Sequence, residues 1–387
     1  MFIIQTDVAA TAPPDQLQGN IEAHWRWYLQ EHPLARTRLG DRSANDRWPD
    51  MSLAALENRY IQRGKFLQSL GEIDTSALSG DEQLNHALLS RRLSARRRRH
   101  ELGLDLMTMN MRSGPQLHHT TLEYTPMTSE QDYQMWLARL RGLPKLLSQY
   151  REILEEGISR QRVQARVIMQ RVPAQIDRLV TPAIDDSPYF KPFRDIPEKF
   201  GPQLAATLKR EARETIAEEV NPAYSDFKSF LLDTYLPASR RAPGIGSLPD
   251  GKSLYSFLAA QFTTTDLTPE QIHAVGKQEV ERILKDMESV KDEVGFSGDL
   301  RAFNNFLRTD PHFYYDTPEA LYQGYLAISK RLDPELVKLF GVLPRMPYGV
   351  RPIPAETAPD TTTAYYMRPA ADGSRAGYYY VNLYRPE

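Results

Sequence analysis

The sequence predicts a mainly α-helical protein, a large helical array that finishes in a small C-terminal β-hairpin. Three observations predict this fold class. Helix-start signals recur along the chain, apolar residues repeat at steps of three and four, and two Tyr-rich runs flank a turn signal at Asp372-Gly373. Steps of three and four place side chains on one face of a helix, whereas Tyr and Thr favour the pleated surface of a strand.

The helix starts rest on capping signals. Ser79 with Glu82 and Thr128 with Gln131 fit the capping box, in which each side chain satisfies a free backbone amide of the other residue. Thr268-Pro269-Glu270-Gln271 adds a proline in the first turn, where its missing N–H costs nothing. The helices predicted from these signals and from the spacing of apolar residues run over about 15–31, 51–70, 80–108, 129–157, 159–179, 196–219, 222–236, 253–262, 269–293, 299–308 and 317–340.

Two apolar stripes predict helices that are buried on one face. The first stripe lies between residues 137 and 154, and the second lies between residues 272 and 290. Glu279 sits beside the second stripe, so it is either one half of a structural ion pair with Arg282 or a pocket acid.

We divide the chain into a helical region over residues 1–240 and a second region over 241–387 that ends in the hairpin. The stretch "APGIGSLPDGK", rich in proline and glycine, lies where the two regions meet. An isolated two-stranded hairpin is marginally stable in water and needs further strands or helices to cover it. We therefore expect the second region to be incomplete and the chain to be truncated, with partners for the hairpin beyond residue 387.

Composition excludes several classes of protein. The 387 residues carry 48 basic and 50 acidic side chains, a net charge of −2, which argues against a dedicated nucleic-acid binder. There is no cysteine, which excludes disulfides, thiolate metal sites and a cysteine nucleophile. No apolar run approaches the ~20 residues that span a bilayer, so we expect no transmembrane segment. The start of the sequence shows no signal peptide, and the compartment stays open.

Motifs for metal or phosphate chemistry are weak in this sequence. None of the eight histidines belongs to a His-Glu-x-x-His pattern, and the adjacent pair His118-His119 points apart on a regular element. We expect His273 to be a buried, hydrogen-bonded histidine rather than a catalytic one. The arginine run over 91–99 wraps all sides of a helix, which is typical of a solvated or salt-bridged surface.

The terminal tyrosines remain as candidate binding residues. With the period of two of a strand, Tyr378, Tyr380 and Asn382 share one face of the hairpin. Together with Tyr365 and Arg368, they form the predicted substrate-binding set. Two interpretations stay open: cross-strand aromatic pairs that stabilise the hairpin, or an exposed edge that pairs with a peptide through main-chain hydrogen bonds.

The order and spacing of several segments give a nearly end-to-end resemblance. The sequence resembles the bacterial "domain of unknown function 885" family, whose members look like zinc metallopeptidases of the gluzincin superfamily. The segments that carry the resemblance include "YLQEHPLARTRLGDRSANDRWPDMS", "SPYFKPF", "VNPAYSDFKSFLLDTYLPASRRAPGIGSLPDGKSLYSF", "FLRTDPHFYYDTPEALYQGY", "LFGVLPRMPYGVRPIP" and "DGSRAGYYYVNLYRP".

The resemblance implies zinc-dependent hydrolysis of short peptides by the full-length protein. In such enzymes Zn²⁺ is held by two histidines and a carboxylate, a glutamate accepts a proton from the bound water, and an edge strand pairs with the substrate backbone. The zinc motif of the family lies downstream of the "GYYYVNL" strand, so no metal ligand or catalytic residue is carried over to this sequence. We expect this chain alone to bind no zinc and to be inactive, and we expect an exported or periplasmic protein.

Two alternatives to a peptidase stay open. One is a non-enzymatic helical protein that captures an extended peptide on its terminal hairpin. The other is a remnant of the family that serves as a scaffold. Substrate preference and oligomeric state do not follow from the sequence.

Overall fold

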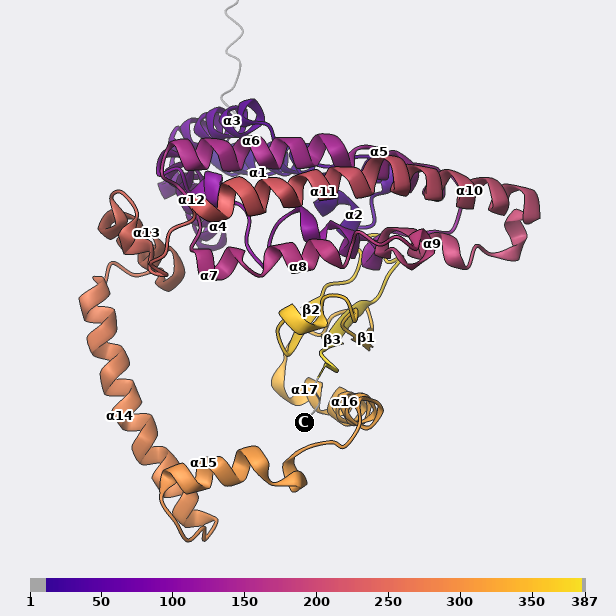
Figure 1. The fold of residues 1–387 in the computed structure, drawn as a ribbon. Helices are drawn as coiled ribbons and strands as arrows, with labels where there is room; N and C mark the ends of the chain where they lie inside the picture. The colour runs from indigo at the N-terminus through magenta and orange to yellow at the C-terminus, as the bar shows by residue number, and fades with distance from the viewer. Residues whose placement is uncertain (1–11, 385–387) are drawn as a thin grey trace, which may run out of the picture. The chain divides into compact units, whose positions relative to one another are not determined.

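A computed structural model describes residues 12–384, and it is mostly helical with one small β-sheet near its C-terminal end (Figure 1). The mainly helical prediction is confirmed. The chain divides into two compact units, Met1–Gly244 and Ile245–Glu387, which we describe separately. No helix within residues 12–384 is both long and apolar enough to cross a membrane.

The first unit begins with helices, one of which starts at the capping box predicted from the sequence. Ser52 caps α3 by accepting a hydrogen bond from the Ala55 amide, and Ser79 forms the predicted capping box with Glu82 at the start of α4. The helix predicted over 80–108 ends early, because Gly103 takes a left-handed conformation with φ of 69°. The bounds are α1 (Pro13–Glu31), α2 (Pro33–Arg38), α3 (Leu53–Gly71) and α4 (Gly80–Glu101). The cluster that packs α1, α3 and α4 together consists of Leu17, Phe66, Leu70, Ile73, Leu78 and Leu93.

The helix predicted over 129–157 is two helices, α5 (Glu130–Arg141) and α6 (Leu143–Ser159). They are joined at Gly142, which ends α5 and precedes α6. A side chain at this position would approach the Arg139 carbonyl oxygen and the Trp48 ring at 3.3 Å each, so glycine allows the tight junction. The apolar stripe runs through both helices and is buried as predicted.

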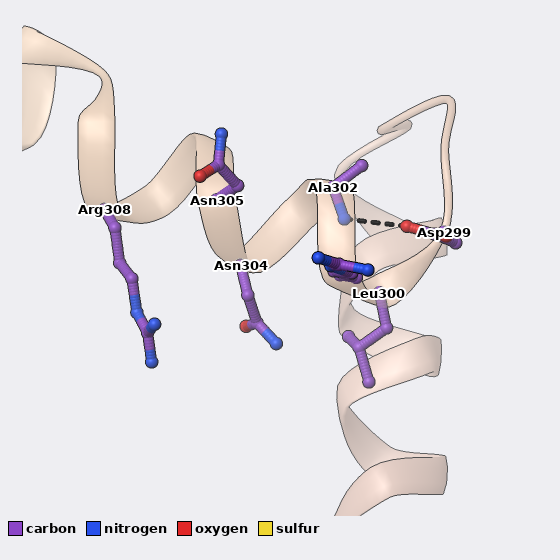
Figure 2. A pocket seen from close by; sticks show the side chains of 7 residues that line it. Asp299, Leu300, Ala302, Asn304, Asn305 and Arg308 are labelled. Carbon is purple, nitrogen blue, oxygen red and sulfur yellow. Dashed lines mark hydrogen bonds between the residues drawn. The ribbon is translucent and has the colours of Figure 1, made fainter.

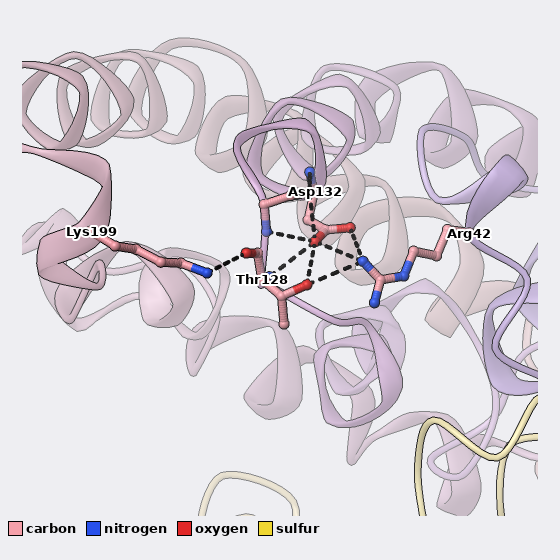
Figure 3. A network of polar contacts seen from close by, with 5 residues as sticks. Arg42, Thr128, Asp132 and Lys199 are labelled. Carbon is pink, nitrogen blue, oxygen red and sulfur yellow. Dashed lines mark hydrogen bonds and ion pairs between the residues drawn. The ribbon is translucent and has the colours of Figure 1, made fainter.

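The capping box at the start of α5 lies one residue later than predicted, and it pairs Ser129 with Asp132. Figure 3 shows Asp132 with Thr128 and Arg42. The Asp132 carboxylate is buried and accepts hydrogen bonds from the Thr128 and Ser129 amides at 2.9 Å each. Arg42 Nη1 lies 3.1 Å from the same carboxylate, and Lys199 donates to the Thr128 carbonyl oxygen. Burial alone would raise the pKa of Asp132, but the hydrogen bonds from Thr128 and Ser129 outweigh burial and hold the pKa below its usual range.

The prediction of one helix over residues 159–179 is wrong. Gln161 has a φ of 54°, and the segment after it pairs with the chain near Arg240, whose amide donates to Gln164. That pairing takes these residues out of helical conformation, and only short helices follow. They are α7 (Arg166–Met169), α8 (Val172–Asp177) and α9 (Lys191–Arg194).

A long helical rod closes the first unit. It runs without a break through α10 (Pro202–Thr215), α11 (Asn221–Phe230) and α12 (Leu236–Ala238). The two junctions are π-helical turns at Ile216–Val220 and Leu231–Tyr235, and each lies just before a proline, Pro222 or Pro237. Proline lacks an amide donor and crowds the preceding turn, and a wider turn accommodates it without ending the helix. The aromatic core that the rod shares with α5 and α6 includes Trp136, Tyr150, Tyr189, Phe193, Tyr224 and Tyr235.

The second unit holds the remaining long helices and the sheet. Thr268 with Gln271 forms the predicted capping box of α14, and Thr317 caps α16. The helix predicted to reach residue 340 ends at Leu332, before Asp333-Pro334. The bounds are α13 (Gly251–Thr263), α14 (Pro269–Glu293), α15 (Leu300–Thr309), α16 (Pro318–Leu332) and α17 (Leu336–Leu339).

The apolar stripe predicted to be buried on α14 is exposed instead. Val275, Ile283 and Val290 are each 45–50% exposed, and α14 has no buried residue. The ion pair expected beside the stripe is present, with Arg282 Nε 2.9 Å from Glu279 Oε2.

The sheet has three strands rather than the two of the predicted hairpin. β2 (Ala364–Met367) and β3 (Gly377–Val381) pair antiparallel, which confirms the hairpin. β1 (Tyr348–Pro352) pairs parallel with the other side of β3, which the sequence did not predict. The strand order is therefore β1-β3-β2. Asp372 organises the hairpin loop by accepting from the amide and the hydroxyl of Ser374.

Candidate functional site

The strand order decides which part of the hairpin can receive a ligand. β3 is hydrogen-bonded on both sides, so its backbone is fully used within the sheet. β1 and β2 are the edge strands, and each has one side free of a neighbouring strand. An edge strand with free amides and carbonyls can pair with another extended chain.

The edge of β1 is partly covered. The outward carbonyl of Val350 accepts a hydrogen bond of 2.9 Å from the Tyr322 hydroxyl of α16. Pro352 has no amide to donate, so it is a poor partner for a further strand. The Tyr348 hydroxyl, at the start of the strand, reaches the Ser329 carbonyl and the Asp333 carboxylate at 3.1 and 3.0 Å.

The edge of β2 is open. The Asn382 amide donates to the Thr363 carbonyl at 2.8 Å, which fixes the alternation of inward and outward groups along the hairpin. Under this alternation, Tyr365 and Met367 bond to β3, whereas the amides and carbonyls of Ala364 and Tyr366 point away from the sheet. Those outward groups form no hydrogen bond with any residue between 12 and 384. We call the outward backbone of Ala364 and Tyr366 the β2 edge.

One face of the sheet is a stack of aromatic rings. Tyr365 lies on Tyr380, with ring centroids 4.9 Å apart and an interplanar angle of 13°. Tyr380 is fully buried, and Tyr378 packs against its edge. Arg351 of β1 covers the Tyr378 ring at 3.7 Å and donates to its hydroxyl at 2.9 Å. The rings therefore stabilise the sheet as cross-strand pairs.

The other face packs partly on α16. Tyr379 meets Tyr325 of this helix, with centroids 6.0 Å apart, and burial raises the pKa of the Tyr325 phenol. Tyr366 shares this face but is 57% exposed. Its ring lies over Gly377, where a side chain would collide with the phenol. Glycine at that position leaves room for the Tyr366 ring to extend over β3.

The structure separates the five predicted binding residues. Tyr378 and Tyr380 belong to the aromatic stack described above. The Asn382 amide group is used within the chain: Nδ2 donates to Ala358 and Thr362 carbonyls at 2.8 and 3.2 Å, and Oδ1 accepts from the Tyr384 amide. Tyr365 and Arg368 lie on or beside β2, and the Arg368 side chain is exposed.

Sequence reasoning did not select Tyr366 or Arg351. The alternation of side chains along a strand was enough to place Tyr366 and Tyr365 on opposite faces of β2. No pattern in the sequence paired Arg351 with Tyr378, because β1 itself was not predicted.

The described residues do not fit a zinc ion. Between residues 12 and 384, no three or more histidine, aspartate or glutamate side chains converge closely enough to hold a metal. His118 is half-buried in the first unit, stacked on Trp48 at 5.0 Å, and burial together with the charges of His119 and Arg139 lowers its pKa to about 3. His273 was predicted to be buried, but it is exposed on α14, which has no buried residue, so this prediction is wrong.

A hollow of about 770 Å³ lies along α15 (Figure 2). Its lining includes the polar side chains of Arg301, Asn304, Asn305 and Arg308. Asp299, at the start of the helix, is already used as the cap of the Ala302 amide at 2.7 Å. The hollow has no buried charged group that would select a ligand, so it does not compete with the β2 edge as a candidate site.

Comparisons with known proteins identify one family. The family model described as "Bacterial protein of unknown function (DUF885)" matches residues 33–387. No curated protein matches the chain.

Two solved structures share the fold. The crystal structure of "the putative lipoprotein from Colwellia psychrerythraea" superposes with a TM-score of 0.85 at 18% identity, over 97% of this chain and 68% of that one. A "putative lipoprotein of unknown function from Shewanella oneidensis" gives a TM-score of 0.59 at 15% identity, over 98% of this chain and 66% of that one. The chain thus spans about two thirds of the length of each, and at these identities the likeness shows the fold alone.

Proposed function

The chain belongs to the bacterial DUF885 family of unknown function, and from this premise we propose that it binds short extended peptides along the β2 edge. One observation carries the proposal. Within one three-stranded sheet, the β1 edge is partly covered at Val350 and Pro352, whereas the outward amides and carbonyls of Ala364 and Tyr366 have no partner in the described chain.

A bound peptide would form a fourth strand. Main-chain hydrogen bonds to Ala364 and Tyr366 supply affinity for any sequence, and side chains beside the edge supply preference. The exposed Tyr366 ring offers an apolar surface to one face of the peptide, and Tyr365 borders the other. Arg368 lies just beyond the strand and is available to a carboxylate of the ligand. Because β2 has only four residues, the site suits short peptides.

Zinc-dependent peptide hydrolysis is the second candidate, and the resemblance to gluzincin peptidases favours it. The β2 edge is the element that such an enzyme would need to hold a substrate backbone. The described residues do not fit zinc, so we derive no catalytic step through the metal. In this proposal the chain's own contribution is to hold the peptide extended.

We also propose that the protein is exported. Both structural neighbours are described as "putative lipoprotein", and export is compatible with a cysteine-free sequence.

Peptide N-methylation tests strand pairing directly. A fluorescein-labelled hexapeptide library identifies a binder, and the binder is then methylated at each backbone nitrogen in turn. Paired strands point every second amide toward the partner, so methylation should weaken binding at alternate positions only. Loss of binding at every position, or at none, would contradict pairing along the β2 edge.

Variants of the protein locate the site. Tyr366→Ala and Arg368→Gln should weaken binding, whereas Tyr255→Ala and Arg331→Gln, exposed residues of the same types on α13 and α16, should not. Metal analysis and mass spectrometry of the incubated peptide separate the two candidates. Cleavage that depends on bound zinc supports the peptidase, and binding without cleavage supports a peptide-binding protein.

A further inference from the structure

On a second surface of the first unit, exposed apolar side chains lie next to arginines. It is formed by α1 and α4, and we call it the α1/α4 face. A hollow of about 290 Å³ lies between these helices. Its lining consists of Ile21, His24, Trp25, Tyr28, Asn85, Leu88, Leu89 and Arg92. Nothing in the peptide-binding proposal uses this surface.

The apolar side chains of the α1/α4 face project into solvent. Trp25 is 46% exposed and stacks on Tyr28 with ring centroids 5.6 Å apart. Leu84 and Leu88, one turn apart on α4, are 57% and 55% exposed. Three large apolar side chains that share one surface lose hydration whenever that surface is covered, which favours association.

Arginines border these side chains. The arginine run over residues 91–99 is predicted to be solvated or salt-bridged, and in the structure its members differ in their contacts. Arg98 pairs with Glu101 at 3.1 Å, and Arg97 stacks on Tyr60 at 4.0 Å. Arg92 instead lies over Tyr28 at 5.5 Å, and Arg96 is exposed. Neither of these two forms an ion pair with a carboxylate in the described part of the chain.

We propose that the α1/α4 face binds the surface of an anionic lipid bilayer. Tryptophan favours the boundary between head groups and acyl chains, where its ring is apolar and its N–H stays hydrated. Leu84 and Leu88 enter the same layer, and Arg92 and Arg96 pair with lipid phosphates, the arrangement of an interfacial amphipathic surface.

The shape of the face favours a membrane over a partner helix. A partner helix would need a long groove for a row of side chains. The hollow of about 290 Å³ is small, and Trp25, Leu84 and Leu88 stand at the surface rather than beneath it.

Vesicle binding tests the proposal on the full chain. The probes are vesicles of phosphatidylcholine alone and of phosphatidylcholine with phosphatidylglycerol, used in co-sedimentation. We expect binding to the anionic vesicles only, with a blue shift of tryptophan emission that Trp25→Phe removes. One arginine near an anionic surface contributes about a fivefold change in partitioning, so Arg92→Gln should reduce binding by about that factor.

Matched controls distinguish vesicle binding by the α1/α4 face from nonspecific adsorption of the protein. The double substitution Leu84→Ser and Leu88→Ser should abolish measurable binding, because it removes two of the three exposed apolar groups. Val167→Ser, an equally exposed apolar residue on α7, and Arg112→Gln, an exposed arginine elsewhere, should leave binding unchanged.

Three outcomes would overturn the proposal. They are no binding to anionic vesicles, equal binding by the α1/α4 variants and the wild type, and binding of an acidic amphipathic peptide to this face without vesicle binding. All variants change exposed residues, and thermal unfolding followed by circular dichroism checks that each is folded.

Discussion

The substitution His118→Phe should remove a large part of the acid sensitivity of the first unit. His118 is enclosed between Trp48, stacked at 5.0 Å, and Tyr150, edge-on at 6.1 Å. Its Nε2 atom is buried with no hydrogen-bond partner among the described residues. Phenylalanine keeps the ring stack and removes the titrating group.

The magnitude follows from the pKa of His118, which burial lowers from the ordinary 6.5 to about 3. The folded state therefore binds the proton less readily than the unfolded state does, and stability is lost as the pH falls below 6.5. One pKa unit corresponds to about 1.36 kcal/mol, so a fall from pH 6.5 to pH 5.0 costs about 2 kcal/mol. The loss continues toward pH 3 and then levels off.

Urea unfolding followed by tryptophan fluorescence measures the effect. All four tryptophans, at positions 25, 27, 48 and 136, lie in the first unit, so the signal reports that unit. Between pH 7.5 and pH 5.0 the wild type should lose about 2 kcal/mol more of its free energy of unfolding than His118→Phe does. His273→Phe, an exposed histidine of the second unit, serves as the control and should match the wild type. Equal pH dependence in the wild type and His118→Phe would refute the reasoning.

Three further predictions concern other parts of the fold. Asp132→Ala should lower the free energy of unfolding of the first unit by about 2 kcal/mol or more in urea unfolding, because it removes a helix cap and leaves Arg42 without its carboxylate; an unchanged midpoint would contradict this role. Gly377→Ala should weaken peptide binding in a fluorescence titration, because the new methyl group displaces the Tyr366 ring; affinity equal to that of the wild type would exclude the ring from the site. Gly373→Ala should lower the thermal midpoint of the second unit by an amount equivalent to about 1 kcal/mol, because its φ of 78° strains any other residue; an unchanged midpoint would show that the loop relaxes.

The sequence predicts those elements whose signals are local. Ser79 and Thr268 each form a capping box with a residue three positions later, and both predicted helices begin at these residues. β1 has no such signal, because "YGVRP" contains glycine and proline and becomes a strand only by pairing with residues nearly 30 positions later. The two π turns are equally hidden, since a proline inside a helical pattern normally predicts an end.

The same difference between local signals and contacts with distant segments explains which parts of the candidate site could be predicted. The alternation of residues in a strand was sufficient to place Tyr378 and Tyr380 on one face, and the structure agrees. Whether that face is exposed depends on the residues that cover it, and these come from distant segments that alternation cannot reveal. Tyr380 is consequently buried, whereas Tyr366, on the other face, is the exposed ring.

The contrast between the two edges of the sheet is the strongest argument that the β2 edge has a ligand. Free edge strands promote aggregation, and proteins commonly close them with proline, charge, short length or a covering element. β1 has two of these protections, a proline and the Tyr322 hydroxyl. β2 has only its short length and the neighbouring Arg368, and it places an exposed tyrosine beside its unpaired amides. A sheet that partly covers one edge and leaves the other open is suited to admit one short strand along the open edge.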